Sequence, residues 1–178
     1  FSFEAVDEAG NTSGASAPID YIVDITAPES IDTSLVIITN PAGIAIDPAS
    51  ATSATTPTFS GSAEPGATVV VSDGDTALGE TTVSEDGSWS FTPDQPLAEG
   101  DHDISFEVID EAGNTSGASA AIDYTVDTIA PEGIDPASIV ITDEAGIVVD
   151  RTETLTASKA TFSGSAEPGA TVTLYDKG

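Results

Sequence analysis

The chain has 178 residues, of which 31 are Asp or Glu and only three are Lys or Arg, so its formal net charge at pH 7 is −28. A surface of this sign excludes nucleic acid and anionic lipid as ordinary partners. The absence of Cys excludes disulfides and thiolate metal sites. No apolar run approaches the roughly 18 residues that a membrane helix needs, so we expect no direct membrane insertion. Because 39% of the residues are apolar, we expect a packed fold in which salt or multivalent cations offset the self-repulsion of the acidic groups.

An internal repeat organises the whole sequence. The segment FEAVDEAGNTSGASAPIDYIVDITAPE from Phe3 recurs from Phe106 as FEVIDEAGNTSGASAAIDYTVDTIAPE, and TFSGSAEPGATV occurs at both Thr58 and Thr161. One offset of 103 residues relates both pairs, so residues 1–75 align on residues 104–178 without a gap, with 44 of the 75 positions identical. A period near 100 residues is far longer than a solenoid repeat and is typical of an immunoglobulin-type sandwich.

This period predicts three parts in the chain. Residues 1–26 are expected to be the last two strands, F and G, of a preceding repeat. Residues 27–129 are expected to form a complete repeat, and residues 130–178 to be strands A to C of a following one. Neither flanking part can bury a core alone, so we expect the polypeptide to continue at both ends.

The local pattern is that of strands. Pro or Gly interrupts nearly every stretch of the sequence, which excludes long helices. Period-two alternation is clear at Ile104, Phe106 and Val108, and at Trp89 and Phe91, so one face of each strand is expected to be core. The strands predicted for the complete repeat are residues 35–39 continued by 44–46 (A), 58–62 (B), 68–72 (C), 77–83 (D), 88–92 (E), 103–110 (F) and 120–127 (G). The predicted fold class is all-β, as tandem seven-stranded immunoglobulin-like Greek-key β-sandwiches.

Four motifs in a fixed order resemble a known family. SGSAEPGATVVV, DGSWSFTP, FEVIDEAGNTS and VDTIAP are similar to the bacterial Ig-like repeats of giant secreted adhesins and biofilm-matrix proteins. The resemblance implies export by a type I route, an extracellular location at the cell surface or in a biofilm matrix, and calcium ions at the junctions between domains. It also implies that such repeats act as extenders whose partners are the neighbouring repeats of the same chain, while other domains bind the host or surface ligand.

Topology predicts which acidic residues meet. In a seven-stranded sandwich the BC, DE and FG loops share the pole at which the preceding linker arrives. Several hard oxygen ligands from different segments are what Ca²⁺ requires. The predicted ligands are Asp24, Glu64, Asp110, Glu111 and Asn114 in the complete repeat, Asp7 for the preceding repeat, and Asp127 and Glu167 for the following junction.

Turn formation is the competing explanation for these residues, because Asp, Asn and Gly favour turns. Turn formation is the favoured explanation for Gly66, Gly87 and Gly113. For Asn114, turn formation and metal ligation both remain open. Asp7, Asp24, Asp110 and Asp127 instead end apolar strands, so metal ligation is favoured for them.

No catalytic motif is present, and the chain is not expected to be an enzyme. The single histidine, His102, has no second His or Cys with which to bind zinc, and we expect it to be a solvated edge residue. The spacing of Asp73 and Asp75 resembles the start of an EF-hand, but Ala77 and Leu78 stand at the next required positions. The alternative function is a ligand-binding or carbohydrate-binding module of an exported enzyme or surface protein, which a cluster of exposed aromatic residues would favour.

Overall fold

The computed structural model describes residues 1–150 and 159–175, and its chain divides into two compact units, residues 1–128 and 129–178. The described residues form strands and two short 3₁₀ turns, which confirms the predicted all-β class. The elements are η1 (Thr33–Leu35), β1 (Ile37–Thr39), β2 (Thr58–Ser62), β3 (Thr68–Asp73), β4 (Thr76–Thr82), β5 (Ser88–Phe91), β6 (Gly100–Ile109), β7 (Ile122–Val126), η2 (Pro136–Ser138), β8 (Val140–Thr142) and β9 (Thr161–Ser163).

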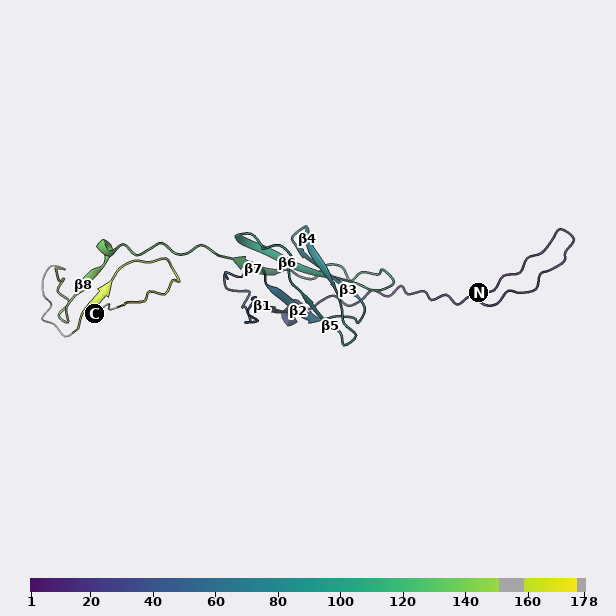
Figure 1. Cartoon of the computed structure of the whole chain (residues 1–178), viewed down its shortest axis with the longest axis horizontal. Helices are drawn as coiled ribbons and strands as arrows, with labels where there is room; N and C mark the ends of the chain where they lie inside the picture. Colours follow the sequence, from purple (N-terminus) through teal and green to yellow (C-terminus); the bar gives the residue numbers. More distant parts are fainter. Residues whose placement is uncertain (151–158, 176–178) are drawn as a thin grey trace. The chain divides into compact units, whose positions relative to one another are not determined.

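Two antiparallel sheets make up the central repeat (Figure 1). One has the order β1-β2-β5 and the other β4-β3-β6-β7, so the chain crosses between the sheets after β2, after β4 and after β5. The ring of Phe59 on β2 packs edge to face against Phe106 on β6 and Tyr124 on β7, with centroids 5.9 and 6.1 Å apart. The two sheets are therefore joined by an aromatic core, as an immunoglobulin-like sandwich requires.

The core follows the alternation that the sequence predicts. Ile104, Phe106 and Val108 are buried on β6, and Trp89 on β5 packs against Phe106 with a centroid separation of 5.3 Å. Every described residue that is buried lies between Pro28 and Val126. The hydrophobic core therefore belongs to the central repeat alone.

The first strand differs from the prediction. Leu35 lies in η1, which Asp32 caps by accepting from the Ser34 N–H at 3.0 Å, so the strand starts only at Ile37. Residues 44–46 do not continue it. They fold back on β1, where the Ile46 N–H donates to the Ile38 carbonyl at 2.9 Å. The chain reverses because the Asn40 side chain accepts from two N–H groups of the turn and Gly43 adopts a φ of 76°.

After this hairpin the chain joins the other sheet. Thr52 forms a parallel bridge with Val126 of β7, and the Asp127 N–H donates to the Thr52 carbonyl at 2.8 Å. The segment before β2 thus contributes to both sheets, which closes one side of the sandwich.

The flanking segments reproduce parts of the central repeat. Residues 1–26 contain a hairpin with a bridge between Val6 and Thr12, as Ile109 and Thr115 bridge in the central repeat. Strand β8 pairs with β9 in the register Val140 to Ser163, which is the register Ile37 to Ser60 of β1 and β2 moved by the repeat period. Residues 171–175, where a third strand was expected, form none in the described part of the chain.

Candidate functional site at the entry pole

Three loops and the incoming linker meet at one end of the central repeat, here called the entry pole. These are residues 24–27, 63–67, 83–87 and 110–114. The Ala63 N–H donates to the Gly87 carbonyl at 2.9 Å, and the Gly66 N–H donates to the Val83 carbonyl at 3.2 Å. The Glu111 carboxylate lies against Gly66, with Oε1 3.0 Å from where a Cβ on that glycine would stand. The loop arrangement that the topology predicts is therefore present.

Asp110 is the most constrained carboxylate at the entry pole. It continues the inward-facing series of β6, so its side chain is only 9% exposed. Its Oδ1 accepts from the Asn114 N–H and its Oδ2 from the Asn114 Nδ2, both at 2.8 Å. The Asn114 side chain, followed by the N–H groups of the turn, lowers the pKa of Asp110. Asp110 is thus held as an anion by its own loop.

The same turn occurs four times in the described chain. Asp7 accepts from the Asn11 N–H and Nδ2 at 2.8 and 2.7 Å, and the Asn11 side chain is the main cause of its lowered pKa. Asn40 and Asp143 build matching turns with their side-chain Oδ1. All four have the sequence Asp or Asn, any residue, Ala, Gly. This short pattern is the sequence signal for the turn, and at residues 110–114 it agrees with the turn expected from the EAGN motif.

The incoming linker is bonded to this turn. The Asn114 Nδ2 donates to the Asp24 carbonyl at 3.3 Å, and the Asp24 carboxylate accepts from the Thr26 N–H at 3.0 Å. Glu64 lies in the 63–67 loop, where its carbonyl accepts from the Ala67 N–H at 3.1 Å. The structure therefore brings the segments of Asp24, Glu64, Asp110, Glu111 and Asn114 to one pole.

The other predicted ligands lie elsewhere. Asp7 lies in the hairpin of residues 1–26, and Glu167 lies in a turn of the second unit, where its carbonyl accepts from the Ala170 N–H as Glu64 accepts from Ala67. Asp127 follows β7 at the opposite end of the sandwich, where it lies close to Glu99.

The donor types at the entry pole, carboxylates and carbonyls, are those that Ca²⁺ prefers. The side chains as they stand do not form a cage. Within residues 1–150 and 159–175, no three Asp, Glu, His or Cys side chains are grouped closely enough to hold a metal ion. The donor atoms at the entry pole are of the kind that binds calcium. The residues that carry them at this pole also form the loops and turns described above.

The opposite end, here called the exit pole, contains a histidine that the prediction misplaced. His102 is only 9% exposed, because it lies on β6 in phase with Ile104 and Phe106. Its Nδ1 lies 2.7 Å from the Asp73 Oδ2, and its Nε2 lies 3.0 Å from the Ala98 carbonyl. The expectation of a solvated edge residue is therefore wrong. Extending the period-two pattern by one more step towards the start of β6 would have predicted the burial.

Glu99, next to Ala98, holds the outgoing chain. Its carboxylate accepts from the Thr128 N–H at 3.0 Å and from the Thr128 Oγ1 at 2.7 Å. The Thr128 hydroxyl, followed by the Thr128 N–H, lowers the pKa of Glu99. Like the entry pole, the exit pole holds the adjoining linker by a side chain of one of its loops.

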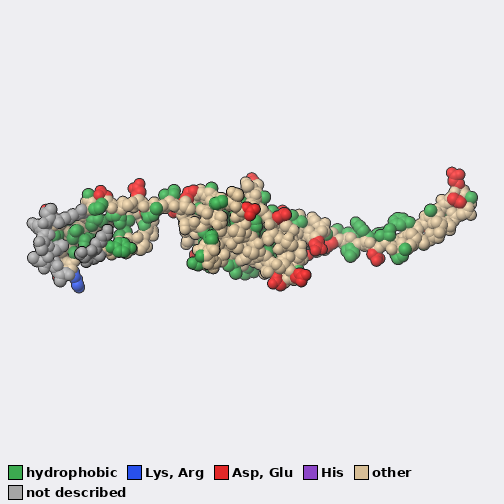
Figure 2. Space-filling model, in the orientation of Figure 1, with side chains coloured by type: hydrophobic (Ala, Val, Ile, Leu, Met, Phe, Trp, Pro, Cys, Tyr) green, Lys and Arg blue, Asp and Glu red, His purple; other side chains and the backbone are tan. Residues whose placement is uncertain are grey.

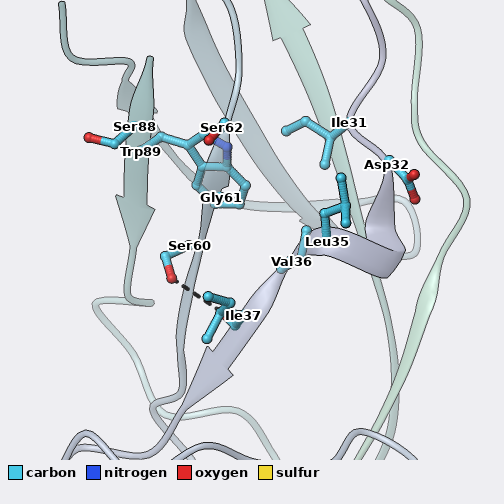
Figure 3. Close-up of a pocket in the computed structure, with 10 residues that line it drawn as sticks. All are labelled: Ile31, Asp32, Leu35, Val36, Ile37, Ser60, Gly61, Ser62, Ser88 and Trp89. Atoms are coloured by element: carbon cyan, nitrogen blue, oxygen red, sulfur yellow. Dashed lines mark hydrogen bonds between the residues drawn. The ribbon is translucent and has the colours of Figure 1, made fainter. Parts of the chain in front are cut away.

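A groove of about 390 Å³ beside β2 bears on the alternative of a ligand-binding module (Figure 3). Trp89 lies over Gly61 of the neighbouring strand, where a Cβ would stand only 3.1 Å from its ring, and Leu35, Val36 and Ile37 line the other side. Trp89 is 3% exposed, so its ring cannot stack on a sugar. The exposed aromatic residues, Phe1, Phe3, Tyr21, Phe162 and Tyr175, all lie in the flanking segments.

Comparison with known proteins shows which family most of the central repeat resembles. Residues 45–128 match the family model of the bacterial Ig-like domain. Domains of this family are typically non-catalytic and generally belong to extracellular or cell-surface proteins. No curated protein matches the chain. Neither of the two helical turns in the described residues is long enough to cross a membrane.

Proposed function

Because the central repeat of this chain is a bacterial Ig-like domain, we propose that the chain is an extender segment of a large secreted adhesin or biofilm-matrix protein. In this role tandem repeats set the distance between a cell and the domains that bind a host or surface ligand. Calcium at the junctions stiffens the array. The partners of the segment are then the neighbouring repeats of its own chain.

The observation that carries this proposal is the bonding of both linkers to the central repeat. The incoming linker is held by Asn114 at the carbonyl of Asp24, and the outgoing linker is held by Glu99 at Thr128. The incoming linker is only Ile25 to Ala27 before Pro28, whose ring restricts the backbone. A short linker bonded to the domain transmits orientation from one repeat to the next, which an extender needs and a tethered binding module does not.

Charge supports a divalent cation at the entry pole. No Lys or Arg occurs within residues 1–128, and Figure 2 shows the Asp and Glu side chains on the visible surface of this region. The Asp110 carboxylate already accepts two hydrogen bonds, yet a carboxylate offers about four acceptor positions in all. Calcium can therefore bind Asp110 without breaking the turn, with Glu111, Glu64 and Asp24 as further oxygen donors from adjacent segments.

Calcium is expected to stabilise the folded chain. Binding only to the native state raises the free energy of unfolding, on the order of 3 to 4 kcal/mol at saturating calcium. The measurement is the melting temperature of the 178-residue chain in millimolar calcium and in excess chelator, at matched ionic strength. A higher melting temperature in calcium supports the proposal. Equal melting temperatures would show that the junctions do not depend on the metal.

A further inference from the structure

His102 is bonded in a way that only its charged form satisfies. Its two ring nitrogens face the Asp73 carboxylate at 2.7 Å and the Ala98 carbonyl at 3.0 Å. Both of these groups can only accept a hydrogen bond. Neutral imidazole has one donor nitrogen and one acceptor nitrogen, so it leaves one contact with two acceptors facing each other. The imidazolium donates to both.

Within residues 1–128 no Lys or Arg competes with His102 for its acidic neighbours. From β3, Asp73 faces the ring, and its second oxygen accepts from the Asp103 N–H at 3.0 Å. On β6, Asp101 and Asp103 flank the histidine, and Asp101 accepts from Thr125 of β7 at 2.7 Å. The cross-strand partner on β7 is Tyr124, whose hydroxyl donates to the Ala54 carbonyl and whose pKa is raised by burial. His102 is the only side chain within residues 1–128 that can carry a positive charge.

These contacts favour protonation. Burial by itself would lower the pKa of His102, but the Ala98 carbonyl, the Asp73 carboxylate and the charge of Asp101 together outweigh it, and the pKa is raised. The charge change of this side chain therefore falls above the ordinary histidine value of about 6.5.

The same contacts connect His102 to the outgoing linker. The Ala98 carbonyl belongs to the residue before Glu99, and the Glu99 carboxylate accepts from the N–H and hydroxyl of Thr128. A shift of Ala98 therefore moves the backbone that carries Glu99. The imidazolium fixes this backbone to Asp73 at the end of β3.

We propose that His102 is a pH-sensitive latch on the outgoing linker. When it is charged, it ties residues 98 and 99 to β3 and holds Glu99 on Thr128. When it loses its proton, one of its two contacts becomes repulsive, residues 98 and 99 detach, and Thr128 is released. The latch acts through hydrogen bonds inside one repeat, so it operates with or without calcium and does not rest on the extender role.

The sign of the pH dependence follows from the raised pKa. The contribution of the latch to stability is fully present below about pH 6.5, the value of the unfolded chain, and is lost as the pH rises through the higher value of the folded chain. The linker is thus held more firmly in a mildly acidic medium than in an alkaline one.

Nuclear magnetic resonance of the full 178-residue chain in excess chelator tests the latch. His102 is the only histidine, so its ring signal is unambiguous. Between pH 5.5 and about 9, we expect its midpoint to lie above about 6.5 and the Thr128 amide signal to change with the same midpoint. Glu99→Ala should remove the change at Thr128 and leave the His102 titration in place. Asp73→Asn should lower the His102 midpoint, since it removes the charge that faces the ring.

Two outcomes would overturn the latch. One is a wild-type Thr128 signal that stays constant while His102 titrates. The other is a His102 midpoint at or below the ordinary histidine value. His102→Gln, whose amide does not titrate in this range, should show a Thr128 signal that no longer depends on pH. If this variant does not fold, the two carboxylate variants still decide the question.

Discussion

The carboxylates of this protein are used first to build turns. Asp7 and Asp110 each accept hydrogen bonds from the backbone and side chain of an asparagine four residues later, and these bonds lower the pKa of each carboxylate. Both therefore stay ionised to a lower pH than an ordinary aspartate does. An ionised carboxylate with acceptor positions left over is a suitable calcium ligand, so the turn hypothesis and the metal hypothesis are compatible at these positions.

Asp110→Ala is expected to weaken calcium binding, because it removes the central carboxylate of the entry pole. The control is Asp94→Ala, an exposed carboxylate directly after Pro93 and away from the entry-pole loops. Titration calorimetry should show a loss of affinity of tenfold or more for Asp110→Ala, about 1.4 kcal/mol, and almost none for Asp94→Ala. Asp110→Asn keeps a carbonyl oxygen and should be intermediate. Identical calcium binding by Asp110→Ala and wild type would place the metal elsewhere.

At the scale of the elements, β2 and β6 connect the core to both poles. Strand β2 begins at Thr58 and leads into the 63–67 loop, while β6 begins two residues before His102 and ends one residue before Asp110. The same strand therefore presents the exit-pole histidine at its start and the entry-pole aspartate at its end. Because β6 is one continuous ten-residue strand, we expect a change in its packing to alter the contacts of both linkers.

Phe59→Ala is expected to destabilise the sandwich strongly. Phe59 is fully buried and packs on Phe106 and Tyr124, so its removal leaves a cavity between the two sheets. The expected loss in the free energy of unfolding is about 3 to 5 kcal/mol, measured by chemical denaturation. Leu35→Ala is the matched control, since Leu35 is 73% exposed and its truncation should cost less than about 0.5 kcal/mol. Equal losses for the two variants would contradict the assignment of the core.

At the scale of the whole molecule, the proposed function depends on how one repeat follows another. Small-angle scattering of proteins with two, three and four repeats in calcium is expected to show a constant cross-section and a length that rises linearly. The increment should be about 35 to 45 Å per repeat, from strands of up to ten residues at roughly 3.3 Å each plus their loops. Folded-back, compact particles in calcium would rule out the extender role, whatever the calcium affinity of a single repeat.

The positions of β2 to β7 and the core were predicted from the sequence alone. Period-two alternation is a local property, so Ile104, Phe106 and Val108 could be assigned to the core without knowledge of their partners. The repeat period located corresponding strands in two copies, and β1–β2 and β8–β9 have the same register in the structure. The family resemblance rested on short motifs and is confirmed for residues 45–128.

Contacts between residues far apart in the chain needed the tertiary structure. Asp73 and His102 are 29 residues apart, and Asp24 and Asn114 are 90 residues apart, so no sequence pattern links either pair. The reversal at Asn40 was missed because a strand pattern continues on both sides of the turn. The role of His102 depended on two acceptors converging on one ring, and its charge follows from that geometry because a lone histidine in a sequence carries no record of what its two nitrogens face.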